Sequence, residues 1–148
     1  MARSVVIMGT ECEYIDNLAR KVAEVADKMF LSMKDLVVYE MQGMIGDMAH
    51  LDSDYINSKV ADVKVRALEY EDSVISIDVT NLSDERLLAG MEDMIKIYAV
   101  SGGCDSDFAV VCDDRDMFLR SIANFVVEKG EIDSQVSQIV EIIAKNQK

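Results

Sequence analysis

Val5-Val6-Ile7-Met8-Gly9, close to the beginning of the chain, is the stretch that decides the fold. Four apolar residues in a row, ended by a glycine, are typical of a strand that is buried on both faces, as the strands of parallel sheets are. The run is too short for the apolar segment of a signal peptide. We therefore expect it to be the first strand of a parallel sheet.

Outward from this strand, helical and extended patterns alternate along the chain. Apolar residues at helical spacing predict an amphipathic helix after the strand: Ile15, Leu18, Ala19, Val22, Val25, Ala26 and Met29. Further strands are expected at Met29–Met33, Ser73–Ile77, Ile95–Val100 and Phe125–Glu128. Further helices are expected at Asp35–Ala49, around Ile56–Ala67, around Leu87–Met94, at Asp113–Ala123 and after Gly130.

Parallel strands need crossovers of about this length, and such crossovers are right-handed. The alternation therefore predicts an α/β fold with three layers, in which helices cover both faces of a five-stranded parallel sheet. Phe108–Cys112 is interpreted as either an edge strand or a loop segment. With no repeat or linker in the chain, we expect one domain over residues 1–148.

Charge and composition exclude several classes of function. Lysine and arginine number 15 against 28 acids, so the net charge is 15 − 28 = −13, which disfavours binding to nucleic acid or anionic lipid. No segment has the eighteen or more apolar residues of a membrane span. The three cysteines show no Cys-x-x-Cys spacing and there is one histidine, so we expect no metal site. The sequence predicts a soluble, cytoplasmic protein.

Two segments carry a resemblance to a known family. The opening Val5–Gly9 strand leads into a helix with Asn17-Leu-Ala19, and Arg115-Asp-Met-Phe-Leu-Arg-Ser-Ile-Ala123 leads into Asn124-Phe-Val-Val127. In this order, over nearly the whole chain, the elements resemble those of the shikimate kinases, which are small P-loop kinases. The resemblance implies a P-loop kinase topology, with Arg115 at a position where the family places an arginine against its substrate.

The phosphate-binding loop of such kinases is not present in this sequence. A P-loop has the form Gly-x-x-x-x-Gly-Lys-[Ser/Thr], because backbone N–H groups, a lysine and a hydroxyl must bind phosphate and magnesium. The corresponding stretch is Gly9-Thr10-Glu11-Cys12-Glu13-Tyr14, which has one glycine, no lysine and two carboxylates. Carboxylates at this place would repel a polyphosphate. We expect ATP to bind poorly here.

The resemblance also places other residues at positions of the family's substrate motifs. Ser32-Met33-Lys34 stands where the family has Asp-x-Asp, and Asp78-Val79-Thr80 stands where it has three glycines. The mobile lid corresponds to about a dozen residues after Val100, without an Arg-Pro motif. The candidate ligand-binding residues are therefore Glu11, Glu13, Lys34, Asp78 and Arg115.

Glu11, Glu13 and Asp78 also have a structural interpretation. Glu11 and Glu13 fit a cation or acid–base site, or simply a helix N-terminus, where carboxylates are favourable by about 0.3–1 kcal/mol. Asp78 fits a working residue at a strand end or a turn residue. Acids after the first strand, with Asp78, Ser101 and Lys129, also fit a phospho-accepting receiver domain.

Three functional hypotheses follow. The first is a non-catalytic protein of the shikimate kinase type that acts as a binding or protein-interaction module, without a cofactor and with a protein partner or a second copy as its partner. Methionines around the second strand and the next helix would then fill a former polar pocket or form a contact surface: Met29, Met33, Met41, Met44 and Met48. The second is a small-molecule kinase that uses Mg-ATP through an atypical phosphate site. The third is a receiver-like signalling domain.

Overall fold

A computed structural model describes residues 4–43, 62, 64–70, 72–78, 85–92, 94–100, 109–128 and 130–146. In chain order the elements are β1 (Val5–Gly9), α1 (Cys12–Ala26), β2 (Met29–Ser32), α2 (Met33–Gly43), β3 (Ser73–Asp78), α4 (Glu85–Gly90), β4 (Ile95–Ala99), α5 (Ala109–Ile122), β5 (Phe125–Val127) and α6 (Ile132–Asn146). All five strands are parallel and lie in the order β2-β3-β1-β4-β5. The predicted α/β fold with a five-stranded parallel sheet is confirmed.

The strand β1 is the centre of the sheet because both of its faces are covered. Every residue of β1 is buried. Val5 and Ile7 join one core, whose other members include residues of α1 and α6, and Val6 and Met8 join a second core with residues of α2, α4 and α5. Successive side chains of a strand point to opposite faces, so an uninterrupted apolar run serves two cores at once.

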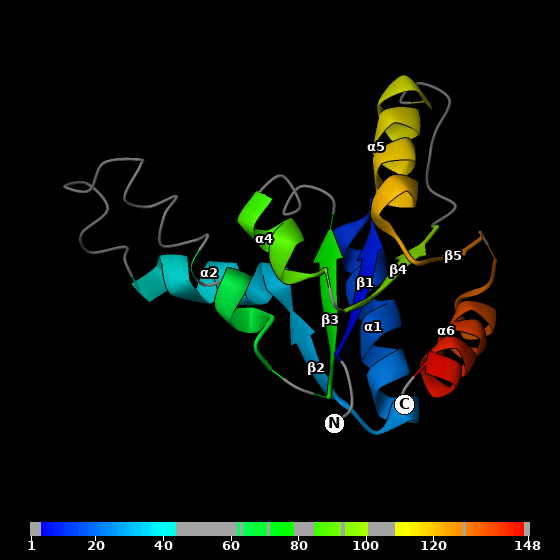
Figure 1. The fold of residues 1–148 in the computed structure, drawn as a ribbon, viewed down its shortest axis with the longest axis horizontal. Helices are drawn as coiled ribbons and strands as arrows, with labels where there is room; N and C mark the ends of the chain where they lie inside the picture. Colours follow the sequence, from blue (N-terminus) through cyan, green and yellow to red (C-terminus); the bar gives the residue numbers. More distant parts are fainter. Residues whose placement is uncertain are drawn as a thin grey trace.

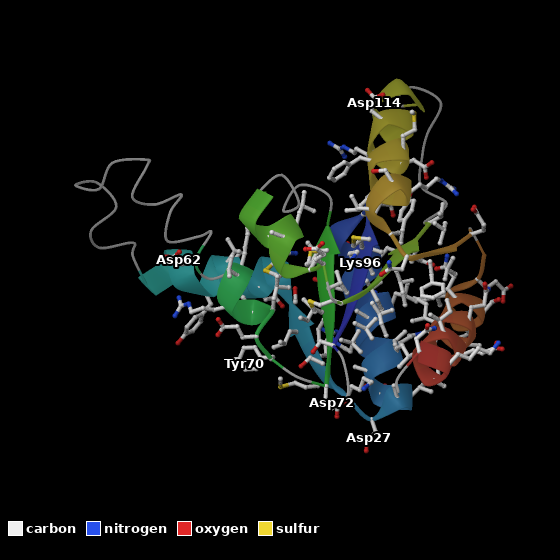
Figure 2. The ribbon with its side chains drawn as sticks, viewed as in Figure 1. Asp27, Asp62, Tyr70, Asp72, Lys96 and Asp114 are labelled. Carbon is white, nitrogen blue, oxygen red and sulfur yellow. The ribbon has the colours of Figure 1, made fainter. Side chains whose placement is uncertain are left out.

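The helices lie on the two faces as these cores require (Figure 1). α1 and α6 pack beside each other on one face, through Leu18, Val22, Ile139 and Ile143. α2 and α4 lie on the other side of the sheet, while α5 extends beyond the ends of the strands (Figure 1). Figure 2 shows Asp114 on α5 at one end of the molecule, and Asp27 and Asp72 together at the other end.

The turn after α1 is fixed by one residue in a left-handed conformation. Asp27 has φ 56° and its N–H bonds the carbonyls of Ala23 and Glu24, which ends the helix at Ala26 and not at Met29. Asp72, before β3, also has a positive φ, and its carboxylate pairs with the amino group of Lys28. Aspartate tolerates this conformation better than most residues.

Several predicted elements differ from the structure in their bounds or type. Phe108–Cys112 was interpreted as an edge strand or a loop segment, but α5 begins at Ala109, so both interpretations are wrong for residues 109–112, and Phe108 is outside the described residues. A short apolar run cannot be assigned to strand or helix by periodicity alone. Helix α4 ends at Gly90, before Met91 and Met94, where the amino group of Lys96 bonds the carbonyls of Met91 (3.1 Å) and Glu92 (3.3 Å).

Other predicted segments lie partly or wholly outside the described residues. The helix predicted at Asp35–Ala49 begins earlier than expected, at Met33, and is described as far as Gly43. Of the helix predicted around Ile56–Ala67, residues 62 and 64–67 are described and are helical. The loop after Val100, with Ser101, and the side chain of Lys129 are outside the described part of the chain.

Candidate functional site

The carboxyl ends of the strands are the place where open α/β sheets bind ligands. At the end of β1, the connection to α1 consists of Thr10 and Glu11 alone. Glu11 is the N-cap of α1, in extended conformation, and its side chain makes no capping hydrogen bond. The first helical bond runs from the N–H of Ile15 to the carbonyl of Glu11 (3.0 Å). The backbone therefore turns directly from strand into helix.

The end of β1 and the first turns of α1 approach each other closely, because residue 9 is a glycine. A Cβ atom built on Gly9 would lie 2.2 Å from Cδ1 and 2.3 Å from Cγ1 of Ile15, and 3.4 Å from the carbonyl oxygen of Ala99. Ile15 is fully buried in the core shared by α1 and α6. The glycine that the sequence aligns with the first P-loop glycine is thus in contact with an apolar side chain of the first turns of α1.

The structure brings four of the five predicted site residues to the ends of neighbouring strands. Glu11 and Glu13 are exposed at the N-terminus of α1, and the backbone of Asp78 is paired in register with Gly9 at the end of β3. The side chain of Asp78 is outside the described part of the chain. Lys34 is exposed in the first turn of α2, which follows directly after β2.

Arg115 is exposed on α5, whereas another arginine of the same helix, Arg120, makes the ordered contacts. Among the described residues, no hydrogen bond or ion pair joins Arg115 to Glu11, Glu13 or Lys34.

A polar cluster that sequence reasoning did not find lies between α1, β2 and β3. The carboxylate of Asp16 accepts hydrogen bonds from the hydroxyls of Ser32 (3.2 Å to each oxygen) and Ser76. The N–H of Asp35 in turn donates to the hydroxyl of Ser32 (3.3 Å). Both serines are buried. A signal was present, because Ser76 interrupts an apolar strand and so requires a buried partner.

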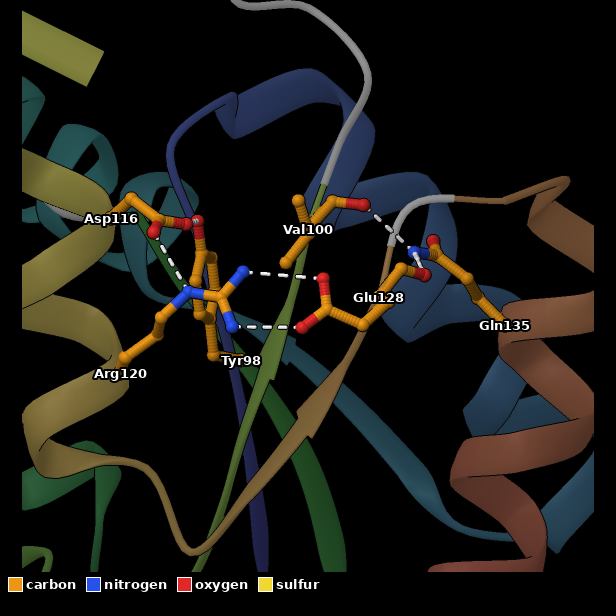
Figure 3. A network of polar contacts seen from close by, with 6 residues as sticks. All are labelled: Tyr98, Val100, Asp116, Arg120, Glu128 and Gln135. Carbon is orange, nitrogen blue, oxygen red and sulfur yellow. Dashed lines mark hydrogen bonds and ion pairs between the residues drawn. The ribbon is translucent and has the colours of Figure 1, made fainter. Parts of the chain in front are cut away.

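A second polar cluster lies at the ends of β4 and β5. The side chain of Gln135, on α6, is completely buried. Its Nε2 donates to the carbonyl of Val100 (2.8 Å), just after β4, and to that of Glu128 (3.0 Å), just after β5 (Figure 3). Its Oε1 accepts from the hydroxyl of Tyr14 on α1. Burial, with a smaller contribution from the charge of Glu11, raises the pKa of Tyr14, so this hydroxyl stays protonated as a donor.

A third set of contacts fixes α5 to the sheet (Figure 3). Arg120 donates through Nε to Asp116 (2.7 Å) and through its two terminal nitrogens to Glu128 (2.8 and 3.2 Å). The hydroxyl of Tyr98, on β4, donates to Asp116 (2.6 Å), and the guanidinium carbon lies 5.8 Å from the centre of the Tyr98 ring. The four residues join β4, α5 and the end of β5.

These contacts shift the pKa of both carboxyls. For Asp116, burial is the largest influence and acts to raise the pKa, but hydrogen bonds from Tyr98 and Arg120 and the charge of Arg120 together lower it. The hydrogen bonds from Arg120 lower the pKa of Glu128. The bonds to Glu128 and then to Asp116 raise the pKa of Arg120, which therefore stays charged.

Acidification is expected to weaken the attachment of α5. Because both carboxyls have a lower pKa in the folded protein, they stabilise it above their ordinary pKa values, and this stability is lost as the pH falls through the folded values. We expect the urea midpoint to fall less steeply between pH 7 and pH 3 in Arg120→Gln than in the wild type. Lys21→Gln, which removes a lysine 3.8 Å from the exposed Asp133, is the control. Parallel pH profiles for Arg120→Gln and the wild type would contradict the expectation.

The chemistry that the described residues offer is limited. In the described ranges, no group of three or more His, Cys, Asp or Glu side chains is placed to hold a metal ion. Every fully buried side-chain nitrogen and oxygen in those ranges has a hydrogen-bond partner. None of the helices described is long and apolar enough to cross a membrane. The buried polar side chains near these strand ends are hydrogen-bonded within the protein, and the charged groups of Glu11, Glu13 and Lys34 are exposed.

The strand order decides against the receiver-like arrangement. A receiver domain orders its strands 2-1-3-4-5. Here β3 lies between β2 and β1, which gives the order β2-β3-β1-β4-β5. The hypothesis of a receiver-like signalling domain is therefore wrong in its topology.

Comparison with known proteins gives the fold but no relative in sequence. No protein-family model matches the chain, and no curated protein matches its sequence. A shikimate kinase from Bacteroides thetaiotaomicron is similar in structure, with a TM-score of 0.75 and 11% identity over 97% of this chain and 99% of that one. A shikimate kinase from Acinetobacter baumannii, in complex with shikimate, has a TM-score of 0.73 and 11% identity over 99% and 95%.

A gluconokinase from Sinorhizobium meliloti 1021 is more distant in structure, with a TM-score of 0.57 and 15% identity over 97% of this chain and 93% of that one. All three are small-molecule kinases by name. Identities this low establish the architecture and not the activity. The chain has the shikimate-kinase-like P-loop kinase fold.

Proposed function

We propose that this protein is a non-catalytic relative of the shikimate kinases, in fold, that acts as a binding or protein-interaction module. The observation that carries the proposal is the two-residue connection between β1 and α1. A phosphate loop needs several successive N–H groups that wrap around the phosphate, together with a lysine. Thr10 and Glu11 are too few to form such a loop, and neither residue is basic.

Electrostatics support the same proposal. The N-terminus of a helix attracts anions by its partial positive charge. In α1 this end is flanked by Glu11 and Glu13, whose negative charges oppose the approach of a phosphate. The net charge of −13 acts in the same direction at longer range.

Internal contacts at the strand ends are a third support. Asp16 is bonded to two buried serines at β2 and β3, and Gln135 is bonded to the ends of β4 and β5. A substrate would have to compete with these hydrogen bonds, because a buried polar group that loses its partner costs about 1–3 kcal/mol.

For the interaction part of the proposal, the support is the outer face of α2. Val38 and Tyr39 are exposed there, Tyr39 to 77%, on the helix that leads into the methionine-rich segment of the sequence. Exposed tyrosine is common at protein interfaces, where its ring is apolar and its hydroxyl wet. A second copy or another protein is the occupant that the hypothesis requires.

Titration with Mg-ATP, alone and with shikimate, tests the non-catalytic part. We expect no heat of binding at micromolar to low millimolar concentrations and no release of ADP. The double variant Glu11→Gln/Glu13→Gln separates the two causes: if repulsion alone excludes ATP, the variant binds it, and if the missing loop excludes it, the variant does not. We expect the second result, because removing charge adds no backbone donors.

A small-molecule kinase with an atypical phosphate site is the second candidate, favoured by a likeness to shikimate kinases that covers 97–99% of the chain. Micromolar binding of Mg-ATP, or any phosphoryl transfer to shikimate, would establish it and reject the first. For the interaction part, sedimentation of the wild type and of Tyr39→Ser is the test. If the wild type sediments strictly as a monomer, and a pulldown from its host captures no partner protein, the interaction part of the proposal is contradicted.

A further inference from the structure

The ends of β4 and β5 present two backbone carbonyls side by side, and the protein fills the space before them with its own side chain. The carbonyl oxygens of Val100 and Glu128 both accept from the Nε2 of Gln135, at 2.8 and 3.0 Å. The two strands continue their pairing up to this point, since the N–H of Val100 bonds the carbonyl of Val127 (2.9 Å). The two acceptors are thus held in place by the sheet (Figure 3).

The opposite side of the carboxamide meets a donor. Its Oε1 accepts from the hydroxyl of Tyr14, which is half-buried on α1. A primary amide has two N–H donors on one side and an acceptor on the other. Both donors of Gln135 and its acceptor are therefore used, by groups from three different parts of the chain. The set of partners is complementary to a primary amide.

Gln135 has no exposed surface, unlike Gln138, which lies on the exposed side of the same helix and bonds only Ser134 (3.3 Å). Glutamine is rarely so buried unless its polar atoms are satisfied. The partners, in contrast, do not depend on Gln135 for their positions, because two are strand-end carbonyls and the third is on a helix packed in the core. Removing the carboxamide should leave the acceptors and the donor in place.

We propose that these groups form a binding site for a primary amide, which the protein occupies with the side chain of Gln135. Ligands of the same chemical class, with an NH₂ group for the two carbonyls and an oxygen for Tyr14, fit the site once Gln135 is shortened. The site uses none of the groups that phosphoryl transfer would need, so it is independent of whether the chain is a kinase.

Chemical rescue of Gln135→Ala by acetamide tests this site, because acetamide is the part of the side chain that the substitution removes. We expect acetamide to bind the variant with a Kd on the order of 10 mM, as is ordinary for so small a ligand. At 100 mM, binding of that strength corresponds to a rise in Tm of about 3–5 °C for a protein of this size. The wild type and Gln138→Ala should show no such rise.

Acetone is the matched control ligand. It has the shape of acetamide and can accept from Tyr14, but a methyl group replaces the NH₂ group that donates to the carbonyls of Val100 and Glu128. We expect acetone to stabilise Gln135→Ala no more than it stabilises the wild type. An equal effect of both ligands, or an acetamide effect no larger than in the wild type, would overturn the proposal.

If Gln135→Ala is unfolded in buffer, recovery of its far-ultraviolet circular dichroism on addition of each ligand replaces the melting measurement. Recovery with acetamide and not with acetone would support the site. Absence of recovery with acetamide at every concentration that the folded wild type tolerates would overturn it.

Discussion

Gly9→Ala is expected to destabilise the protein by about 1–3 kcal/mol, the usual cost of forcing extra volume into a packed core. The new methyl group would lie 2.2–2.3 Å from the side chain of Ile15, which is fully buried, so the side chain or the backbone has to shift to admit it. An alanine in a strand is otherwise slightly better than a glycine, by about 0.5–1 kcal/mol. The cost of the clash therefore has to exceed this favourable contribution, so a measured loss of stability in Gly9→Ala would itself support the clash.

Ile15→Ala in the same chain provides the decisive comparison. Alone, it should cost about 2–5 kcal/mol because it leaves a cavity. Combined with Gly9→Ala it removes the two atoms that clash, so the effect of Gly9→Ala should become neutral or stabilising in this background. Gly130→Ala is the control for glycine itself, because its new methyl group meets no atom closer than 4.0 Å. Additive effects of the two core substitutions in urea unfolding would contradict the packing argument.

Asp16→Ala is expected to cost about 2–3 kcal/mol, through the hydroxyls that it leaves without an acceptor. Ser32 and Ser76 are both nearly inaccessible to water, and both donate to the Asp16 carboxylate. An unsatisfied buried donor costs about 1–3 kcal/mol. Urea unfolding measures the loss, and Asp16→Asn, which keeps one acceptor oxygen, should lose less. Asp133→Ala, at a position 89% exposed, should change stability by less than about 0.5 kcal/mol.

The triple variant Asp16→Ala/Ser32→Ala/Ser76→Ala distinguishes lost hydrogen bonds from lost packing. With all three polar groups removed, no buried hydroxyl is left without an acceptor. The N–H of Asp35 also loses the Ser32 hydroxyl, but Asp35 is exposed in the first turn of α2, so the triple variant should still be more stable than Asp16→Ala alone. If it is less stable than the single variant, the cluster contributes by packing and the hydrogen-bond account is wrong.

The architecture was predictable from the sequence because both faces of the sheet are buried. Val5–Gly9 has no polar residue at alternate positions, and this is a local property that a single sequence displays. The helix boundaries were less predictable: Asp27 ends α1 by its left-handed backbone, and Lys96, on the following strand, bonds two carbonyls just after the end of α4. Neither feature can be predicted from the spacing of the apolar residues along the helix.

The polar clusters were harder to predict because their members are distant in the sequence. Asp16 and Ser76 are 60 residues apart, and Tyr14 and Gln135 are 121 residues apart. Gln135 stands four residues before Ile139, on the apolar side of its helix, but nothing local shows that two strand ends lie against it. Glu11, Glu13 and Lys34 follow strand ends, as their positions in the sequence predict, and all three are exposed; that they bind a ligand stays a prediction.

The central place of β1 has a consequence for the chain as it leaves the ribosome. β1 is made first, yet Val5 pairs with Val74 on one side and Ile95 on the other. This strand therefore has no partner to pair with until β3, which begins at Ser73, has been synthesised, and its second neighbour, β4, comes later still. Contacts between such distant residues slow folding, because long loops must close before any pairing is gained. Throughout that interval, this apolar strand is without its partners and is open to binding by chaperones and to aggregation.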